Sequence, residues 1–124
     1  MPLKFDYLGM DEPILVTITG EFGEEDFTRL LEEFTKSTEY PPNADVVYDL
    51  TEMSFDNVST EFFTSLVDIA ERYPQRSGAR LAYVCPEDLQ YGMMRVWGVM
   101  VNRIPVNVNV FRSMEKAMAW IKDK

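Results

Sequence analysis

Two hydrophobic patterns, one typical of strands and the other of helices, alternate along the chain. Few fold classes have their strands and helices in such an alternating order. Short segments rich in β-branched residues alternate apolar and polar positions or are almost wholly apolar, which is typical of strands. Longer segments place apolar residues at i, i+3, i+4 and i+7, which is typical of helices that bury one face. The expected order is β-β-α-β-α-β-α-β-α. Strands that alternate with helices predict a mostly parallel sheet joined by right-handed crossovers.

The expected strands are 3–7, 14–19, 46–50, 81–85 and 106–110. The first two flank a turn at 9–12 and are expected to form an antiparallel hairpin at the N-terminal edge of the sheet. The third and fourth are nearly continuous apolar runs, as central parallel strands are. The fifth alternates valine with asparagine, which predicts a strand with one wet face at a sheet edge.

Four helices are expected, and each has a start or stop signal. Acidic residues 24–26 and 87–88 suit the positive end of a helix dipole, and Ser113 can cap the last helix. Pro74 and Pro105 end the second and third helices. The residues expected to face the core are Phe27, Leu30, Leu31 and Phe34, then Phe62, Leu66, Ile69 and Tyr73, then Leu89, Met93, Val96, Trp97 and Met100, and finally Met114, Ala117, Met118 and Ile121. The sequence therefore predicts one α/β domain over residues 1–124, with a five-stranded sheet and four helices.

The amino-acid composition of the chain excludes several classes of function and disfavours others. The 124 residues are 46% apolar, enough for a real core, and carry a formal charge of −9, which disfavours nucleic acid or an anionic membrane surface as the main partner. The chain has no histidine, so serine and cysteine hydrolases of the usual kind and histidine zinc sites cannot be built. A single cysteine, Cys85, excludes an all-cysteine zinc site. Neither G-x-G-x-x-G nor the P-loop motif is present. We expect no enzyme activity, no cofactor and no metal.

The carboxylate pairs and the single cysteine can be explained without a catalytic role. The pairs Glu24–Glu25 and Glu87–Asp88 lie in expected first helical turns, where acids complement the dipole. Cys85 ends a strand before a helix, but its acidic neighbours would raise its pKa. No secretory signal and no apolar run of about 20 residues is visible, so we expect a cytoplasmic protein without a membrane span.

The stretch 46–63, VVYDLTEMSFDNVSTEFF, joins a buried strand to a helix through a polar bend. It resembles the STAS domain, the family of bacterial anti-sigma-factor antagonists and sulfate-transporter tails, in which Asp-Leu-Ser, a phenylalanine and Asp-Ser-Ser-Gly follow the strand. The matching positions are Asp49, Leu50 and Thr51, then Phe55, then Asn57, Val58, Ser59 and Thr60. Ser59 coincides with the serine that is phosphorylated in that family, whereas Val58 and Thr60 replace a serine and a glycine.

The last quarter of the chain resembles a divergent branch of STAS-like proteins that is often grouped with the CRAL-TRIO lipid-binding fold. The matching residues are Tyr91, Gly92, Met93 and Arg95, then Val110, Phe111, Arg112, Ala117 and Trp120. The resemblance runs from about Pro13 to the C-terminus. It implies a STAS-like fold and a non-enzymatic regulatory or protein-interaction module; the alternative is a binding protein for a small apolar molecule or lipid, held between the third helix and the sheet.

Two candidate sites follow. The first is the loop 51–60 with the preceding strand end, where Asp49, Thr51, Phe55, Asn57 and Thr60 are expected to form an interaction loop around Ser59. Ser59 is either a phosphorylated switch or has no such role, in which case Ser59 or Asn57 is simply the N-cap of the second helix.

The second candidate site is a flank of the third helix that extends its apolar stripe, formed by Met94, Trp97 and Val101 beside Tyr91. A neighbouring helix, a second protomer or an apolar ligand would cover this flank. The expected partners are therefore another protein or a second copy, with an apolar ligand as the alternative.

Overall fold

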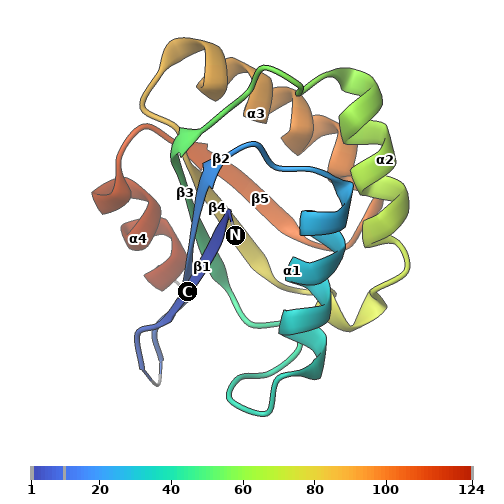
Figure 1. Ribbon diagram of the computed structural model, residues 1–124. Coiled ribbons are helices and arrows are strands. Elements are labelled where there is room, and N and C mark those ends of the chain that lie inside the picture. Colours follow the sequence, from blue (N-terminus) through green and yellow to red (C-terminus); the bar gives the residue numbers. More distant parts are fainter. Residues whose placement is uncertain (1, 10, 124) are drawn as a thin grey trace.

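The computed structural model describes residues 2–9 and 11–123. Its strands are β1 (Leu3–Tyr7), β2 (Ile14–Gly20), β3 (Val46–Met53), β4 (Arg80–Val84) and β5 (Asn107–Phe111), and its helices are α1 (Glu24–Lys36), α2 (Thr60–Ala70), α3 (Asp88–Met100) and α4 (Met114–Lys122) (Figure 1). Two short 3-10 turns, η1 (Pro74–Arg76) and η2 (Val101–Arg103), follow α2 and α3. The predicted order of strands and helices is confirmed.

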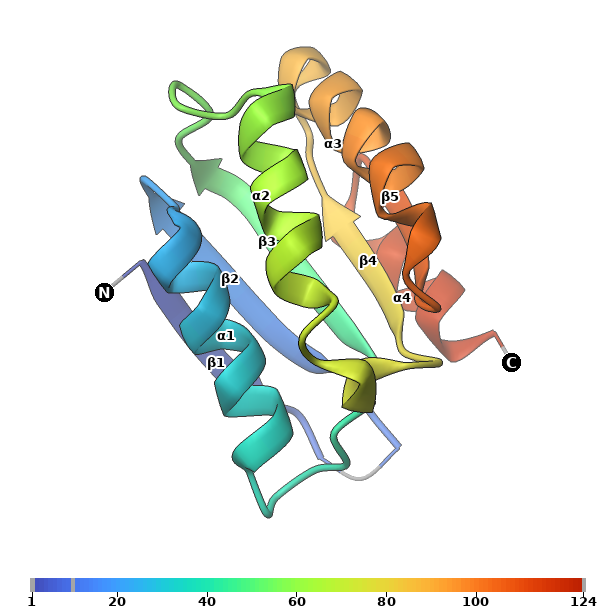
Figure 2. The same cartoon turned by 90° about the vertical axis from the view of Figure 1, so that its right-hand side faces the viewer.

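The strands form one five-stranded sheet in the order β1-β2-β3-β4-β5. The β1 strand is antiparallel to β2, and every other neighbouring pair is parallel. The predicted antiparallel N-terminal edge and the predicted edge position of the last strand are both confirmed. Helices α1, α2 and α3 cover one face of the sheet, and α4 covers the other (Figures 1 and 2). The protein is thus a three-layer α/β domain.

Alternation along the strands divides the core between the two faces of the sheet. Ile14, Val16 and Ile18 of β2 point toward α1, α2 and α3, with the inward residues of β3 and β4 beside them. On the other face, Val47 and Val84 belong to a smaller cluster that α4 completes through residues such as Ala117. Because both faces are covered, residues 46–48 of β3 and 81–84 of β4 are buried at every position, as their continuous apolar runs predicted.

Among the element ends that differ from those predicted, two change the place of a predicted residue. The β3 strand continues past residue 50 to Met53, because β2 shifts register after Thr17 and then pairs Thr19 with Glu52 and Gly20 with Met53. Thr51 therefore belongs to the strand and not to the loop. Helix α2 ends at Ala70, so Tyr73 follows it instead of lying on its buried face.

The predicted core face of α3 was correct at Trp97 and wrong at Leu89 and Val96. Leu89 and Val96 were expected to be buried, but their side chains are 70% and 43% exposed. The buried residues of the helix are Met94 and Trp97. Apolar side chains occupy most of the circumference of α3, so periodicity alone does not fix its orientation. The indole of Trp97 buries the most surface and finds aromatic partners in other elements, and α3 is oriented accordingly.

Candidate functional site

The end of β3 holds the first two residues of the predicted interaction loop. Oδ1 of Asp49 accepts hydrogen bonds from the backbone N–H of Thr51 at 3.0 Å and from its hydroxyl at 2.6 Å. Asp49 is half-buried in the sheet and Thr51 is exposed. The pair stiffens the strand end from which the loop leaves.

The loop between β3 and α2 is held at both ends. The backbone N–H of Ser54 donates to the carbonyl of Gly20 at 2.8 Å, and Gly20 has a φ of 69°, a conformation that favours glycine. The side-chain amide of Asn57 donates to Oε1 of Glu21 at 3.1 Å. Phe55 is buried in the main core, so it anchors the loop from beneath and its ring does not form part of the exposed surface.

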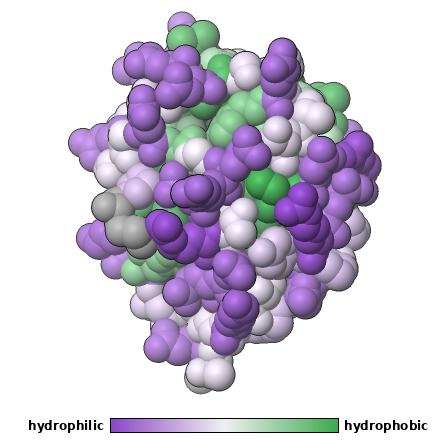
Figure 3. All heavy atoms as spheres, turned by 45° about the vertical axis from the view of Figure 1, so that its right-hand side comes forward, coloured by the Kyte–Doolittle hydropathy of each residue, from purple (hydrophilic) through white to green (hydrophobic). Residues whose placement is uncertain are grey.

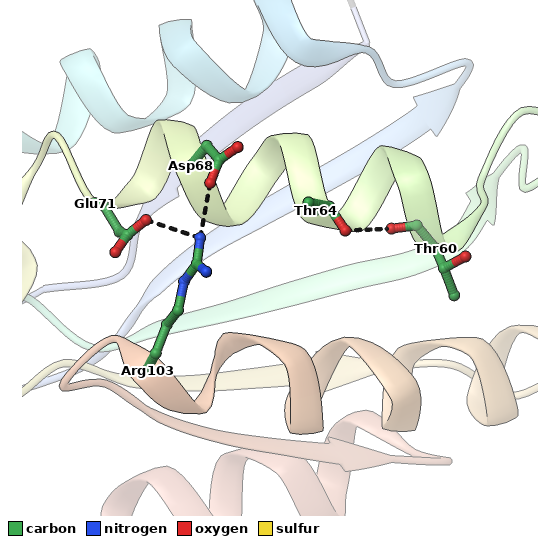
Figure 4. Close-up of polar contacts among 5 residues, drawn as sticks. All are labelled: Thr60, Thr64, Asp68, Glu71 and Arg103. Atoms are coloured by element: carbon green, nitrogen blue, oxygen red, sulfur yellow. Dashed lines mark hydrogen bonds and ion pairs between the residues drawn. The ribbon is translucent and has the colours of Figure 1, made fainter.

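Ser59 is exposed and is the N-cap of α2. Its Oγ accepts a hydrogen bond from the backbone N–H of Phe62 at 3.1 Å. Thr60 is the first residue of the helix, and its carbonyl accepts from the Thr64 hydroxyl at 3.0 Å (Figure 4). The capping role of Ser59 is confirmed, and its phosphorylation stays a prediction.

Replacing Ser59 by alanine is expected to lower the free energy of unfolding by about 1 kcal/mol, because the N–H of Phe62 loses its acceptor. Ser59→Asn is the matched variant, since asparagine can accept the same bond. It should lower the free energy of unfolding by only about a few tenths of a kcal/mol. Urea unfolding of the three proteins gives the comparison. Equal losses for both variants would contradict a capping role.

The second candidate site is covered by the chain itself. Met94, Trp97 and Val101 are 5%, 3% and 3% exposed, so they cannot form a face for a second protomer. Trp97 packs edge-on against Phe27 of α1, and its indole N–H donates to the hydroxyl of Tyr83 at 3.1 Å. These contacts come from α1 and β4, elements that the helix pattern of α3 alone does not bring in.

Tyr91 lies apart from those three residues and is half-buried. The guanidinium of Arg112 lies over its ring at 4.3 Å and that of Arg95 at 6.0 Å. Arg112 also forms an ion pair with Asp88. Tyr91 therefore joins α3 to the end of β5 at the margin of the main core, against which its ring packs.

The outward face of α3 carries exposed aliphatic side chains. Leu89 and Val99 are each 70% exposed, and Val96 lies between them along the helix. The amide nitrogen of Gln90 donates to the carbonyl of Met53 at 3.5 Å, so the N-terminal end of this helix adjoins the loop before α2. Apolar surface shows at the upper end of the molecule, where α3 lies, among polar atoms (Figure 3). We call Leu89, Val96, Val99 and the loop 54–60 the contact surface.

Arg103 connects the end of α3 to α2. Its Nη2 lies 2.7 Å from Oδ1 of Asp68 and 2.8 Å from Oε1 of Glu71 (Figure 4). All three side chains are about half exposed, so solvent screens the pairs and their contribution to stability is small. Their effect is to keep the outer sides of the two helices in a fixed relation.

Beneath the helices lies an apolar cavity of about 40 Å³. Its walls come from α1, α2, α3 and the central strands: Ile18, Phe22, Phe27, Leu30, Tyr48, Leu50, Met53, Phe62, Phe63, Leu66, Tyr83, Met94 and Trp97. Figure 2 shows the three helices lying across the sheet above this region. Met94 and Trp97, predicted for a ligand face, thus line the cavity, whereas Val101 lines a second cavity of about 30 Å³.

The second cavity contains a charged residue that the sequence did not single out. Arg76 lines it and is only 5% exposed. Its Nη1 donates to the carbonyls of Pro42 at 2.7 Å and Ala44 at 3.0 Å. Arg76 stands in a polar stretch after Pro74, which was expected to end the second helix, so no local pattern marks it as buried.

The Cys85 thiol is fully buried. Burial, together with the charge of the nearby Asp49 carboxylate, raises its pKa to about 12. At pH 8 only about one thiol in ten thousand is then ionised. We expect no reaction of the native protein with a thiol-reactive aromatic disulfide at that pH, and release of one equivalent of thiolate reporter after denaturation, since the chain has one cysteine. Prompt reaction of the folded protein would contradict this.

Comparison with known proteins gives the family. The SpoIIAA-like family model matches residues 14–122. The chain belongs to the SpoIIAA-like family. This confirms the STAS-like resemblance noted in the 46–63 segment. The SpoIIAA-like match covers every element except β1.

A solved structure shows the same fold. It is described as an uncharacterized protein from the DUF3478 family with a SpoIIAA-like fold, from Shewanella loihica PV-4. The two chains superpose with a TM-score of 0.63 over 96% of this chain and 91% of the other, at 20% sequence identity. The search of curated proteins found no match.

Two further searches concern residues 2–9 and 11–123. No helix in this part of the SpoIIAA-like chain is both long and apolar enough to cross a membrane. Within the same ranges, no three or more histidine, cysteine, aspartate or glutamate side chains come together as a metal site would require.

Proposed function

We propose that this SpoIIAA-like protein is a non-enzymatic regulatory module that acts by binding another protein through the contact surface. The observation that carries the proposal is the exposure of Leu89, Val96 and Val99 on one helix. Exposed aliphatic side chains grouped on one element, and rimmed by polar residues, are typical of protein-binding sites. The adjoining loop presents Ser59 within reach of a partner or a kinase.

The charge around the contact surface indicates what kind of partner fits. Glu21, Asp56 and Glu61 are exposed at the loop and the start of α2, and the whole chain carries a charge of −9. A second copy would bring the same acidic groups to the interface, and the two sets would repel. A different protein, with basic residues around an apolar patch, fits this surface better.

Phosphorylation of Ser59 would act on the same surface. A phosphate adds about −1.5 to −2 charge at the positive end of α2, where the dipole favours it. It would also add charge beside Asp56 and Glu61, which repel it. The phosphate on Ser59 would attract a basic partner. Mass spectrometry of protein from its native host is the direct check for the modification.

The chemistry of the chain supports binding over catalysis. There is no histidine to serve as a general base near neutral pH. The one thiol is buried, and its pKa is raised to about 12. Glu24, Glu25 and Asp26 lie in the first turn of α1, where they complement the helix dipole.

A photo-reactive amino acid at position 99 tests the protein-binding proposal in the native host. We expect a discrete cross-linked species that is lost when Leu89 and Val96 are both changed to aspartate. A matched control is the same photo-reactive residue at exposed Lys36, at the far end of α1, which should give no such species. A species of twice the chain mass would show self-association, and no specific species at all would contradict the proposal.

A second candidate function is the binding of a small apolar molecule, and the aromatic cavity favours it. Phe27, Tyr48, Tyr83 and Trp97 line both cavities, so the two spaces share these walls. A volume of 30 to 40 Å³ has room for water-sized contents, so a larger ligand has to displace side chains such as Met94. Saturable, stoichiometric uptake of a fluorescent fatty acid would support this function, and a lack of uptake would contradict it.

A further inference from the structure

One atom of Arg76 is left without a hydrogen-bond partner in the interior. Nη1 of this side chain is occupied by the carbonyls of Pro42 and Ala44. Nη2 is buried and has no partner within residues 2–9 and 11–123. A buried charged donor without an acceptor costs more free energy than a neutral one. A polar group placed this way calls for an acceptor that the described residues do not supply.

The guanidinium of Arg76 lies at the wall of the second cavity. It lies over the ring of Phe34 at 4.6 Å, which supports one face of its plane. Arg76 lines the 30 Å³ cavity together with Tyr48 and Tyr83, whose rings stack at 4.7 Å between centroids. Every other wall of that cavity is apolar or aromatic: Phe27, Leu31, Ala70, Leu81, Trp97, Val101, Ile104 and Val106. The second cavity thus has one cationic side chain in an otherwise apolar or aromatic wall.

We propose that Nη2 of Arg76 binds the carboxylate of a small apolar carboxylic acid, whose body lies between the helices and the sheet among Phe27, Tyr48, Tyr83 and Trp97. The proposal rests on the second proposed function, because it names the class of ligand that the apolar cavity takes. It goes further in assigning a head-group site to a residue that the sequence did not mark.

A carboxylate fits this position better than the other common acceptors. The guanidinium presents its N–H groups in a plane that matches a carboxylate, and charge-assisted hydrogen bonds of this kind are about twice as strong as neutral ones. A phosphate also matches the fork but is bulkier and carries more charge, which is costly in a space of 30 Å³ lined mainly by apolar side chains. A neutral hydroxyl would leave the arginine charge without a counter-ion.

Other groups act on the same charge without occupying Nη2. Burial is the largest effect and lowers the pKa of Arg76, while Tyr48, Tyr83 and the Asp45 carboxylate act in the opposite direction. Oδ1 of Asp45 accepts from the backbone N–H of Arg80 at 2.9 Å. A bound carboxylate would add a second negative charge, besides that of Asp45, near the buried guanidinium of Arg76.

The test compares head groups on the unchanged protein, so it does not depend on a variant that folds. Phenylpropionate and phenylpropanol form one matched pair, and octanoate and octanol form another. We expect each acid to bind at least tenfold more tightly than its alcohol, measured by titration calorimetry. In nuclear magnetic resonance spectra, the side-chain N–H signals of Arg76 and the indole N–H of Trp97 should shift with the acid.

Each outcome has a distinct meaning. Equal or tighter binding of the alcohols would overturn the role of Arg76 but keep the apolar-ligand function. Binding of none of the four compounds would overturn both. A supporting variant is Arg76→Lys, which keeps the charge but loses the planar fork, so the preference for the acid over the alcohol should become smaller. The control is Arg95→Lys on the exposed side of α3, where the preference should stay.

Discussion

Replacing Trp97 by alanine is expected to lower the free energy of unfolding by about 3–5 kcal/mol. The indole is 3% exposed and packs against Phe27 at 6.2 Å and Phe63 at 5.5 Å between ring centroids. The change removes these aromatic contacts and leaves the Tyr83 hydroxyl without the indole donor. It also enlarges a space that already lies beneath α3, and the cost of such a change grows with the volume left empty.

The matched control is Val99→Ala, two residues further along the same helix. Val99 is 70% exposed, so its truncation removes little buried surface and should change stability by about 0.5 kcal/mol or less. Urea unfolding followed by circular dichroism measures both variants. A loss below about 1 kcal/mol for Trp97→Ala, or an equal loss for Val99→Ala, would mean that the orientation of α3 described above is incorrect.

The same helix shows where sequence reasoning reaches its limit. The strands could be predicted because Ile14, Val16 and Ile18 alternate with less buried positions, and period two leaves only one face to bury. On α3, apolar residues lie on nearly all sides, so several faces are compatible with the pattern. The choice among them depends on Phe27 and Phe63, which belong to other helices and contact Trp97 only in the folded chain.

The candidate sites divide in the same way between local and distant causes. The cap at Ser59 could be foreseen, because the bond to Phe62 joins residues three positions apart. The burial of Arg76 could not, because its acceptors on Pro42 and Ala44 are 34 and 32 positions away in the sequence. The extension of β3 likewise follows from a register shift in its neighbour β2.

Alkaline pH is expected to destabilise the protein through its buried phenols. Burial raises the pKa of Tyr48 from its ordinary value of 10.0 to about 12, and it raises the pKa of Tyr83 well above the ordinary value. Below about pH 10 both phenols are protonated in the folded and unfolded chains, so their contribution is fully present. Between about pH 10 and 12 the unfolded chain releases protons that the folded chain retains, and stability falls as pH rises. For Tyr48 alone, two pKa units correspond to a loss of about 3 kcal/mol.

Tyr48→Phe separates this contribution from general alkaline effects. Phenylalanine keeps the ring that stacks on Tyr83 but has no proton to release, so the fall in the free energy of unfolding between about pH 10 and 12 should be smaller by about 3 kcal/mol than in the unchanged protein. Urea titrations at a series of pH values give both slopes, and tyrosinate absorbance reports ionisation directly. Parallel slopes for the two proteins would show that Tyr48 titrates in the folded chain as it does in the unfolded one. Solvent would then reach the stacked phenols, and the aromatic side chains that line both cavities would have to move apart in solution.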